Sequence, residues 1–163
     1  MQQKKDKTYS RQKAVLASFG TKINSEDSSP VLSWNPTSLF VPGRLNELKK
    51  LVFRIKPALL AIQEWRSSEA PPALKGFHSI VRGLSLLYIR NDITYSVVEP
   101  ADSFPNIHVV QILSNKCLYS AIYVHPLCRP QVFKSFLEHQ NLSNKQLQKF
   151  VFGISMCTVL DLD

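Results

Sequence analysis

The sequence predicts a single α/β domain built on one mixed sheet flanked by helices, and three observations predict it. Two short apolar runs, residues 31–34 and 58–62, enclose an amphipathic stretch, an order typical of a strand, a crossover helix and a parallel strand. Further apolar runs follow in pairs separated by turn residues, which indicates hairpins. The chain has 163 residues, of which 44% are hydrophobic, and this is enough for one domain with its own core.

The first three elements follow from local signals. A strand over residues 31–35 ends there because Pro36 disfavours a helical conformation in the residue before it. A helix is expected over residues 43–56, and Pro57 ends it. Residues 58–62 are apolar without alternation, which is typical of a strand buried on both faces. One face of the helix is lined by aliphatic residues at spacings of three to four, namely Leu45, Leu48, Leu51, Val52 and Ile55.

The remaining elements are predicted from apolar runs and the turn residues between them. In chain order they are strands at residues 77–81, 84–89 and 93–98, a hairpin of residues 107–113 with 116–124, a helix at residues 129–140 and a short apolar run at residues 150–152. The turn of that hairpin is placed at Ser114 and Asn115.

Two polar residues at the ends of the first two strands mark a candidate site. Asn35 is the last residue of the first predicted strand, and Glu64 lies just after the second. A strand, helix, strand unit brings the carboxyl ends of its parallel strands to one edge of the sheet. Ligands of open α/β sheets bind at that edge.

The amino-acid composition limits which binding partners and which cellular compartment we expect. Lys and Arg number 20 against 12 Asp and Glu, a net charge of +8, which suits a polyanion such as DNA or RNA, although a basic surface with no partner remains an alternative. The three cysteines have neither an even count nor metal-ligand spacing, and no secretory signal is recognised. We therefore expect an intracellular protein, nuclear or cytoplasmic and not secreted. No apolar run approaches the roughly 20 residues of a membrane span, so no membrane partner is expected.

Residues 1–29 are predicted to form a basic, mostly disordered leader. They contain six Lys or Arg and three Asp or Glu residues and end in a polar run before Pro30. A nucleic-acid-binding arm and a solvated tail are the two interpretations of this segment.

Four motifs in order resemble one family, the endonuclease/exonuclease/phosphatase or DNase I-like superfamily. The match is to the N-terminal half of a non-LTR retrotransposon endonuclease domain. The motifs are Leu32-Ser33-Trp34-Asn35, Ala61-Ile62-Gln63-Glu64, the run from Gly83 to Asp92 that ends in Arg-Asn-Asp, and Ala121-Ile122-Tyr123-Val124-His125-Pro126.

The resemblance implies the N-terminal half of a four-layered α/β sandwich and a Mg²⁺-dependent or Mn²⁺-dependent hydrolase that nicks DNA. Glu64 would be the metal ligand, and Asn35 and Tyr123 would be active-site residues. These types suit phosphodiester cleavage, because Mg²⁺ is held by one or two carboxylates with waters, and amide and hydroxyl groups stabilise charge that develops on oxygen. The plain alternatives are a solvated strand-end charge at Glu64, a turn former at Asn35 and a half-buried aromatic at Tyr123.

Departures from the family predict a truncated domain over residues 30–153 that is inactive alone. The Gly-Asp-Phe-Asn, later Asp and terminal Ser-Asp-His motifs are not readable. If a G precedes them, codons selected among the synonyms for residues 154–157 read Asp-Phe-Asn-Val and begin a His codon in the neighbouring frame, so residues 154–163 are interpreted as an out-of-frame tail. Metal binding is then weak or absent, and half a sandwich exposes an apolar sheet face open to self-association or a partner. A nonenzymatic nucleic-acid-binding or interaction module is the alternative function.

Overall fold

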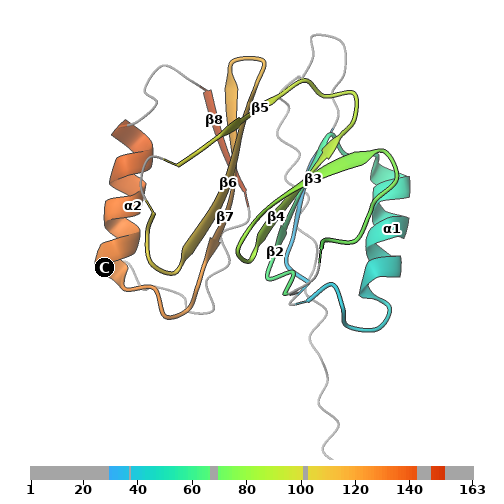
Figure 1. Cartoon of the computed structure of the whole chain (residues 1–163), viewed down its shortest axis with the longest axis horizontal. Coiled ribbons are helices and arrows are strands. Elements are labelled where there is room, and N and C mark those ends of the chain that lie inside the picture. Colours follow the sequence, from blue (N-terminus) through green and yellow to red (C-terminus); the bar gives the residue numbers. More distant parts are fainter. Residues whose placement is uncertain (1–29, 37, 67–69, 101–102, 143–147, 153–163) are drawn as a thin grey trace, which may run out of the picture.

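The computed structural model describes residues 30–36, 38–66, 70–100, 103–142 and 148–152. The predicted leader, residues 1–29, and the predicted out-of-frame tail, residues 154–163, lie outside these ranges. Within them the elements follow the order β1, α1, β2, β3, β4, β5, β6, β7, α2 and β8 (Figure 1).

The first unit is the predicted parallel pair with its crossover helix. Strand β1 (Val31–Trp34) is hydrogen-bonded in parallel to β2 (Leu59–Gln63), with Val31 opposite Leu59 and Trp34 opposite Ile62. Helix α1 (Arg44–Ile55) begins after Gly43, whose φ of 87° is a left-handed conformation that glycine adopts at little cost. It ends at Lys56, whose N–H donates to Val52 O at 2.8 Å.

Two antiparallel strands complete the first sheet. Strand β4 (Ser85–Arg90) lies between β2 and β3 (Phe77–Arg82), which gives the order β1-β2-β4-β3. All five residues of β2 and the first five of β4 are buried. These two strands are central in the sheet and covered on both faces, which is why their sequences lack alternation.

A second sheet follows, where the sequence predicted only one. Its order is β5-β6-β7-β8, and β8 runs parallel to β7. Its elements are β5 (Ser96–Val98), β6 (Ile107–Ser114), β7 (Cys117–Val124), helix α2 (Pro130–Leu142) and β8 (Gln148–Phe152). The predicted mixed α/β class is confirmed; the single sheet is corrected to two.

The layers run α1, first sheet, second sheet, α2 (Figure 1). Buried residues of both sheets, among them Leu59, Leu87, Val110 and Ala121, form one cluster between the sheets. A second cluster lies between α1 and the first sheet around Leu48, and a third packs Phe136 of α2 on the second sheet. The inner face of the first sheet is therefore covered by β6 and β7, so the predicted exposed apolar sheet face does not exist in the described part of the chain.

The turn of the β6–β7 hairpin lies one residue later than predicted. Ser114 pairs with Cys117, and the two residues between them, Asn115 and Lys116, have φ of 48° and 62°. Two successive positive φ values are the signature of a type I′ turn, whose twist matches that of the strands. The resulting register places His108 opposite Tyr123.

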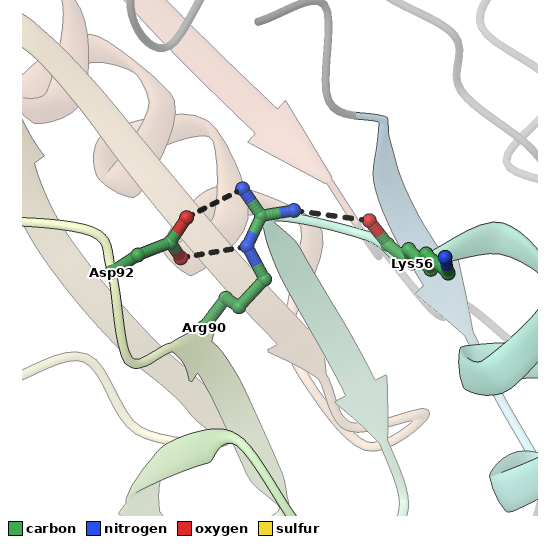
Figure 2. Close-up of polar contacts among 3 residues, drawn as sticks. All are labelled: Lys56, Arg90 and Asp92. Atoms are coloured by element: carbon green, nitrogen blue, oxygen red, sulfur yellow. Dashed lines mark hydrogen bonds and ion pairs between the residues drawn. The ribbon is translucent and has the colours of Figure 1, made fainter.

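The Arg-Asn-Asp end of β4 stabilises the opposite edge of the sheet from Asn35 and Glu64. Arg90 holds Asp92 through two bonds, Nε to Oδ1 at 2.6 Å and a terminal nitrogen to Oδ2 at 2.9 Å (Figure 2). The guanidinium also donates to Lys56 O at 3.2 Å, just after α1. This motif therefore joins the end of the helix to the start of β2 and the end of β4.

Among the described residues, no helix is long and apolar enough to cross a membrane.

Candidate functional site

Asn35 and Glu64 meet at the carboxyl ends of β1 and β2, as the sequence predicted for their strands. Asn35 Nδ2 donates to Glu64 Oε1 at 3.3 Å, across 29 positions of sequence. Glu64 is 5% exposed, so its carboxylate is largely withdrawn from water. A buried carboxylate needs such donors, because its desolvation is otherwise costly.

The backbone around Glu64 is held in an uncommon conformation. Glu64 and Arg66 have φ of 55° and 44°, in the left-handed region that residues other than glycine seldom adopt. The Glu64 N–H donates to Leu84 O at 2.9 Å, and the Arg66 guanidinium lies 3.2 Å from Glu64 Oε2. Both carboxylate oxygens thus face a donor. Strained residues of this kind concentrate at functional sites.

The turn between β3 and β4 joins this carboxylate to a histidine of the second sheet. Leu84 accepts from Glu64 through its carbonyl oxygen, and its own N–H donates to His108 Nδ1 at 3.0 Å. A nitrogen that accepts carries no proton, so neutral His108 has its proton on Nε2. Burial, followed by the charge of nearby His125, lowers the pKa of His108 below its ordinary value of 6.5.

Gly83 precedes this contact and cannot carry a side chain without displacing the histidine. A Cβ on Gly83 would lie 2.7 Å from His108 Nδ1 and 2.8 Å from Cγ. The Gly83 carbonyl also accepts from Trp65 Nε1 at 2.9 Å. The β3–β4 turn therefore contacts Glu64, Trp65 and His108 at once.

Tyr123 contacts the ring of His108. Its ring is stacked on the His108 ring with centroids 5.8 Å apart and meets the edge of His125 at 6.3 Å. The Tyr123 side chain is 1% exposed. The structure thus brings Asn35 and Glu64 into direct contact. Tyr123 is connected to Glu64 only indirectly, through His108 and Leu84, and its catalytic role stays a prediction.

Polar side chains continue between the sheets below the site. Ser33 Oγ donates to Gln63 Oε1 at 3.4 Å, and Ser85 Oγ donates to Ala121 O at 3.0 Å. Gln63 is 1% exposed, and within the described ranges its Nε2 has no hydrogen-bond partner. The interior at this edge is therefore less apolar than the core around Leu59 and Val110.

His108 also lines a pocket of about 300 Å³ together with Gly83 of the β3–β4 turn. An ion pair between Arg82 and Glu99 lies at this pocket, and Phe104 and Phe136 supply apolar walls. Gly83 lines this pocket, whereas Glu64 does not.

The donor set at Glu64 fits a hard cation held by one protein carboxylate. Mg²⁺ prefers oxygen ligands and commonly keeps several waters beside one or two carboxylates. In the part of the chain that the structure describes, no group of three or more His, Cys, Asp and Glu side chains is placed to hold a metal. A cation at Glu64 would compete with the Arg66 guanidinium for Oε2.

His108 is the site residue that sequence reasoning missed. It belongs to none of the family motifs, and its position opposite Tyr123 depends on the β6–β7 register. The signal that reveals it is the Asn115-Lys116 turn, because a two-residue turn there fixes the pairing of every later residue in the hairpin.

Two solved structures are similar to this chain in fold. One is the endonuclease domain of TRAS1, a telomere-specific non-LTR retrotransposon, with 19% sequence identity and a TM-score of 0.47. The match covers 74% of this chain and 57% of the TRAS1 chain. The other is humanized D. rerio TDP2, with 12% sequence identity and a TM-score of 0.46. That match covers 71% of this chain and 56% of the TDP2 chain. The chain thus spans little more than half of either. No protein-family model and no curated protein sequence matches it.

Proposed function

We propose that this chain is a DNase I-like domain of the retrotransposon-endonuclease type that binds the DNA backbone at its Asn35–Glu64 edge. The observation that supports this most directly is the 3.3 Å bond between Asn35 and Glu64 at the ends of two parallel strands. Ligands of α/β sheets bind at such an edge. The net charge of +8 suits a polyanion.

Glu64 would hold Mg²⁺, or Mn²⁺, beside a phosphate group. When bound, the ion neutralises negative charge on the phosphoryl oxygens. The Asn35 amide holds the carboxylate in position through Oε1, and the Arg66 guanidinium balances its charge at Oε2 until a cation displaces it. The Tyr123 hydroxyl is proposed as a donor to phosphate oxygen.

We further propose that the chain does not hydrolyse DNA on its own. A general base needs a free acceptor within reach of the attacking water. His108 is the histidine linked to Glu64 through Leu84, and its Nδ1 already accepts from the Leu84 N–H.

The experiment compares DNA binding and DNA cleavage by the whole chain. Fluorescence anisotropy measures affinity for labelled DNA, and conversion of supercoiled to open-circular plasmid in Mg²⁺ or Mn²⁺ measures nicking, each for the natural chain and Glu64→Gln. We expect binding by both proteins and nicking by neither. Metal-dependent nicking that Glu64→Gln abolishes would overturn the proposed inactivity, and failure of the natural chain to bind would overturn the function itself.

The alternative is a nonenzymatic basic module that binds through its leader. The support for this alternative is that residues 1–29 contain six Lys or Arg residues but only three Asp or Glu residues. Binding through phosphate contacts alone weakens steeply with salt. If deletion of residues 1–22 abolishes binding while Glu64→Gln leaves its metal dependence unchanged, the leader and not the Asn35–Glu64 edge is the binding element.

A further inference from the structure

The loop between β1 and α1 carries two exposed apolar side chains and contacts Trp65, the residue after Glu64. Phe40 is 48% exposed and Val41 is 46% exposed. The loop is fixed there because the Leu39 N–H donates to Trp65 O at 3.3 Å, and Leu39 itself is buried at 2% exposure. The position of Phe40 is thus set by the residue directly after Glu64.

The Trp65 ring contacts the Phe40 ring. The two ring centroids are 6.5 Å apart with an interplanar angle of 48°, and Trp65 is only 3% exposed. Its Nε1–H donates to Gly83 O, so the indole is held by the β3–β4 turn. Phe40 therefore contacts a ring that is itself held in place, while about half of its side chain stays exposed to solvent.

A cationic group completes this surface. The Arg66 side chain is 54% exposed, and its guanidinium lies 3.2 Å from Glu64 Oε2. Arg66 directly follows Trp65, the residue whose ring contacts Phe40. Proteins that bind single-stranded nucleic acids combine aromatic rings, which stack on bases, with cations, which contact the backbone. We call Phe40, Trp65 and Arg66 the Phe40 platform.

We propose that the Phe40 platform stacks an unpaired base of single-stranded DNA whose phosphate lies at the Asn35–Glu64 edge. This inference rests on the proposed function and adds a preference for strands with an unpaired base. Bases inside a duplex have both faces covered by their neighbours, so a ring at the surface gains stacking only from a base that is already unstacked. Duplex DNA is then bound through its backbone alone.

Phe53 provides a matched control on the same molecule. It is the more exposed phenylalanine, at 82%, and it lies on α1 rather than on the loop beside Trp65. Phe53→Ala and Phe40→Ala remove the same side chain from the surface. A general loss of apolar surface therefore affects both variants, whereas loss of the platform affects only Phe40→Ala.

The test measures the affinity of the whole chain for a labelled strand of about 12 nucleotides and for the matching duplex. We expect tighter binding of the single strand, and Phe40→Ala to weaken it about fivefold to a hundredfold while changing duplex affinity less than about twofold. Phe53→Ala should leave both affinities unchanged, and Phe40→Tyr should retain single-strand binding. Thermal unfolding confirms that each variant is folded.

Three results would overturn the platform: equal affinity of the natural chain for strand and duplex, equal effects of Phe40→Ala and Phe53→Ala, or no recovery with Phe40→Tyr. In each of these cases duplex binding can remain intact, which leaves the proposed function standing. Absence of binding to both DNAs is the separate result that would overturn the proposed function and the platform with it.

Discussion

Substituting Gly83 by Ala should destabilise the fold because of one contact, the approach of Gly83 to His108. The added Cβ would lie 2.7 to 2.9 Å from three atoms of the imidazole ring, closer than carbon atoms approach in packed proteins. The ring cannot withdraw easily, since its Nδ1 accepts from Leu84 N–H and its face is stacked on Tyr123. We expect the ring to move and the Leu84 bond to break.

The cost has two parts. Gly83 has φ of 54°, and placing an alanine there costs about 1–2 kcal/mol of backbone strain. Leaving the Leu84 N–H without its acceptor costs about 1–3 kcal/mol. The free energy of unfolding should therefore fall by about 2–5 kcal/mol. Gly76→Ala is the control, because Gly76 has φ of 86° with no atom within 4 Å of the added Cβ, so only the backbone cost of about 1–2 kcal/mol applies.

Urea unfolding, followed by tryptophan fluorescence, measures how much free energy of unfolding Gly83→Ala and Gly76→Ala each lose. The excess of Gly83→Ala over Gly76→Ala, about 1–3 kcal/mol, should disappear when the two substitutions are compared in a His108→Ala background, because the clashing ring is then absent. Equal losses for the two alanine variants in the natural background would refute this account. So would an excess that persists without His108.

Three other predictions follow from the ion pairs. Arg90→Lys should lower the free energy of unfolding by about 1–2 kcal/mol in chemical denaturation, because lysine cannot bridge both Asp92 oxygens and Lys56 O; a loss no larger than for a surface lysine change would contradict this. The hydrogen bond from Arg90 lowers the pKa of Asp92 below 3.8, so the stability lost in Asp92→Asn should be constant at neutral pH and shrink as pH falls through and below that value; a difference that grows with acid would have the wrong sign. Arg66→Ala should lower the Mn²⁺ concentration at half-saturation about twofold to fivefold, because Glu64 Oε2 becomes accessible to the cation. Electron paramagnetic resonance measures this binding, and an unchanged midpoint would show that the guanidinium does not compete.

The first unit of the fold was predictable because its signals are local. The aliphatic spacing of α1, the prolines after Asn35 and Lys56, and the unbroken apolar run of β2 each describe their own segment. The contact between Asn35 and Glu64 follows from the same unit, because the carboxyl ends of two parallel strands lie at one edge of the sheet. That part of the site needed no knowledge of the rest of the chain.

The second sheet and His108 were not predictable in the same way. Which strands share a sheet depends on pairing between segments far apart in sequence, and apolar runs such as β6 and β7 suit a central strand of either sheet. The position of His108 depends on a turn shifted by one residue, from Ser114-Asn115 to Asn115-Lys116. A shift of that size changes which side chain faces Tyr123.

The Arg-Asn-Asp motif shows that resemblance does not distinguish a binding role from a structural one. Its arginine and aspartate lie at the end of β4, where Arg90 binds Asp92 and the carbonyl of Lys56. Glu64 lies after the opposite end of the neighbouring strand β2. The motif stabilises the sheet that carries the site without contributing a side chain to it.

The most direct test of the proposed site is the Mg²⁺ dependence of DNA affinity at constant ionic strength, compared between the natural chain and Glu64→Gln. Glutamine keeps the shape and one acceptor oxygen but not the charge that holds a hard cation. We predict that Mg²⁺ tightens DNA binding by the natural chain and has no such effect on Glu64→Gln. An identical response of the two proteins to Mg²⁺ would contradict a metal-assisted phosphate site at the Asn35–Glu64 edge.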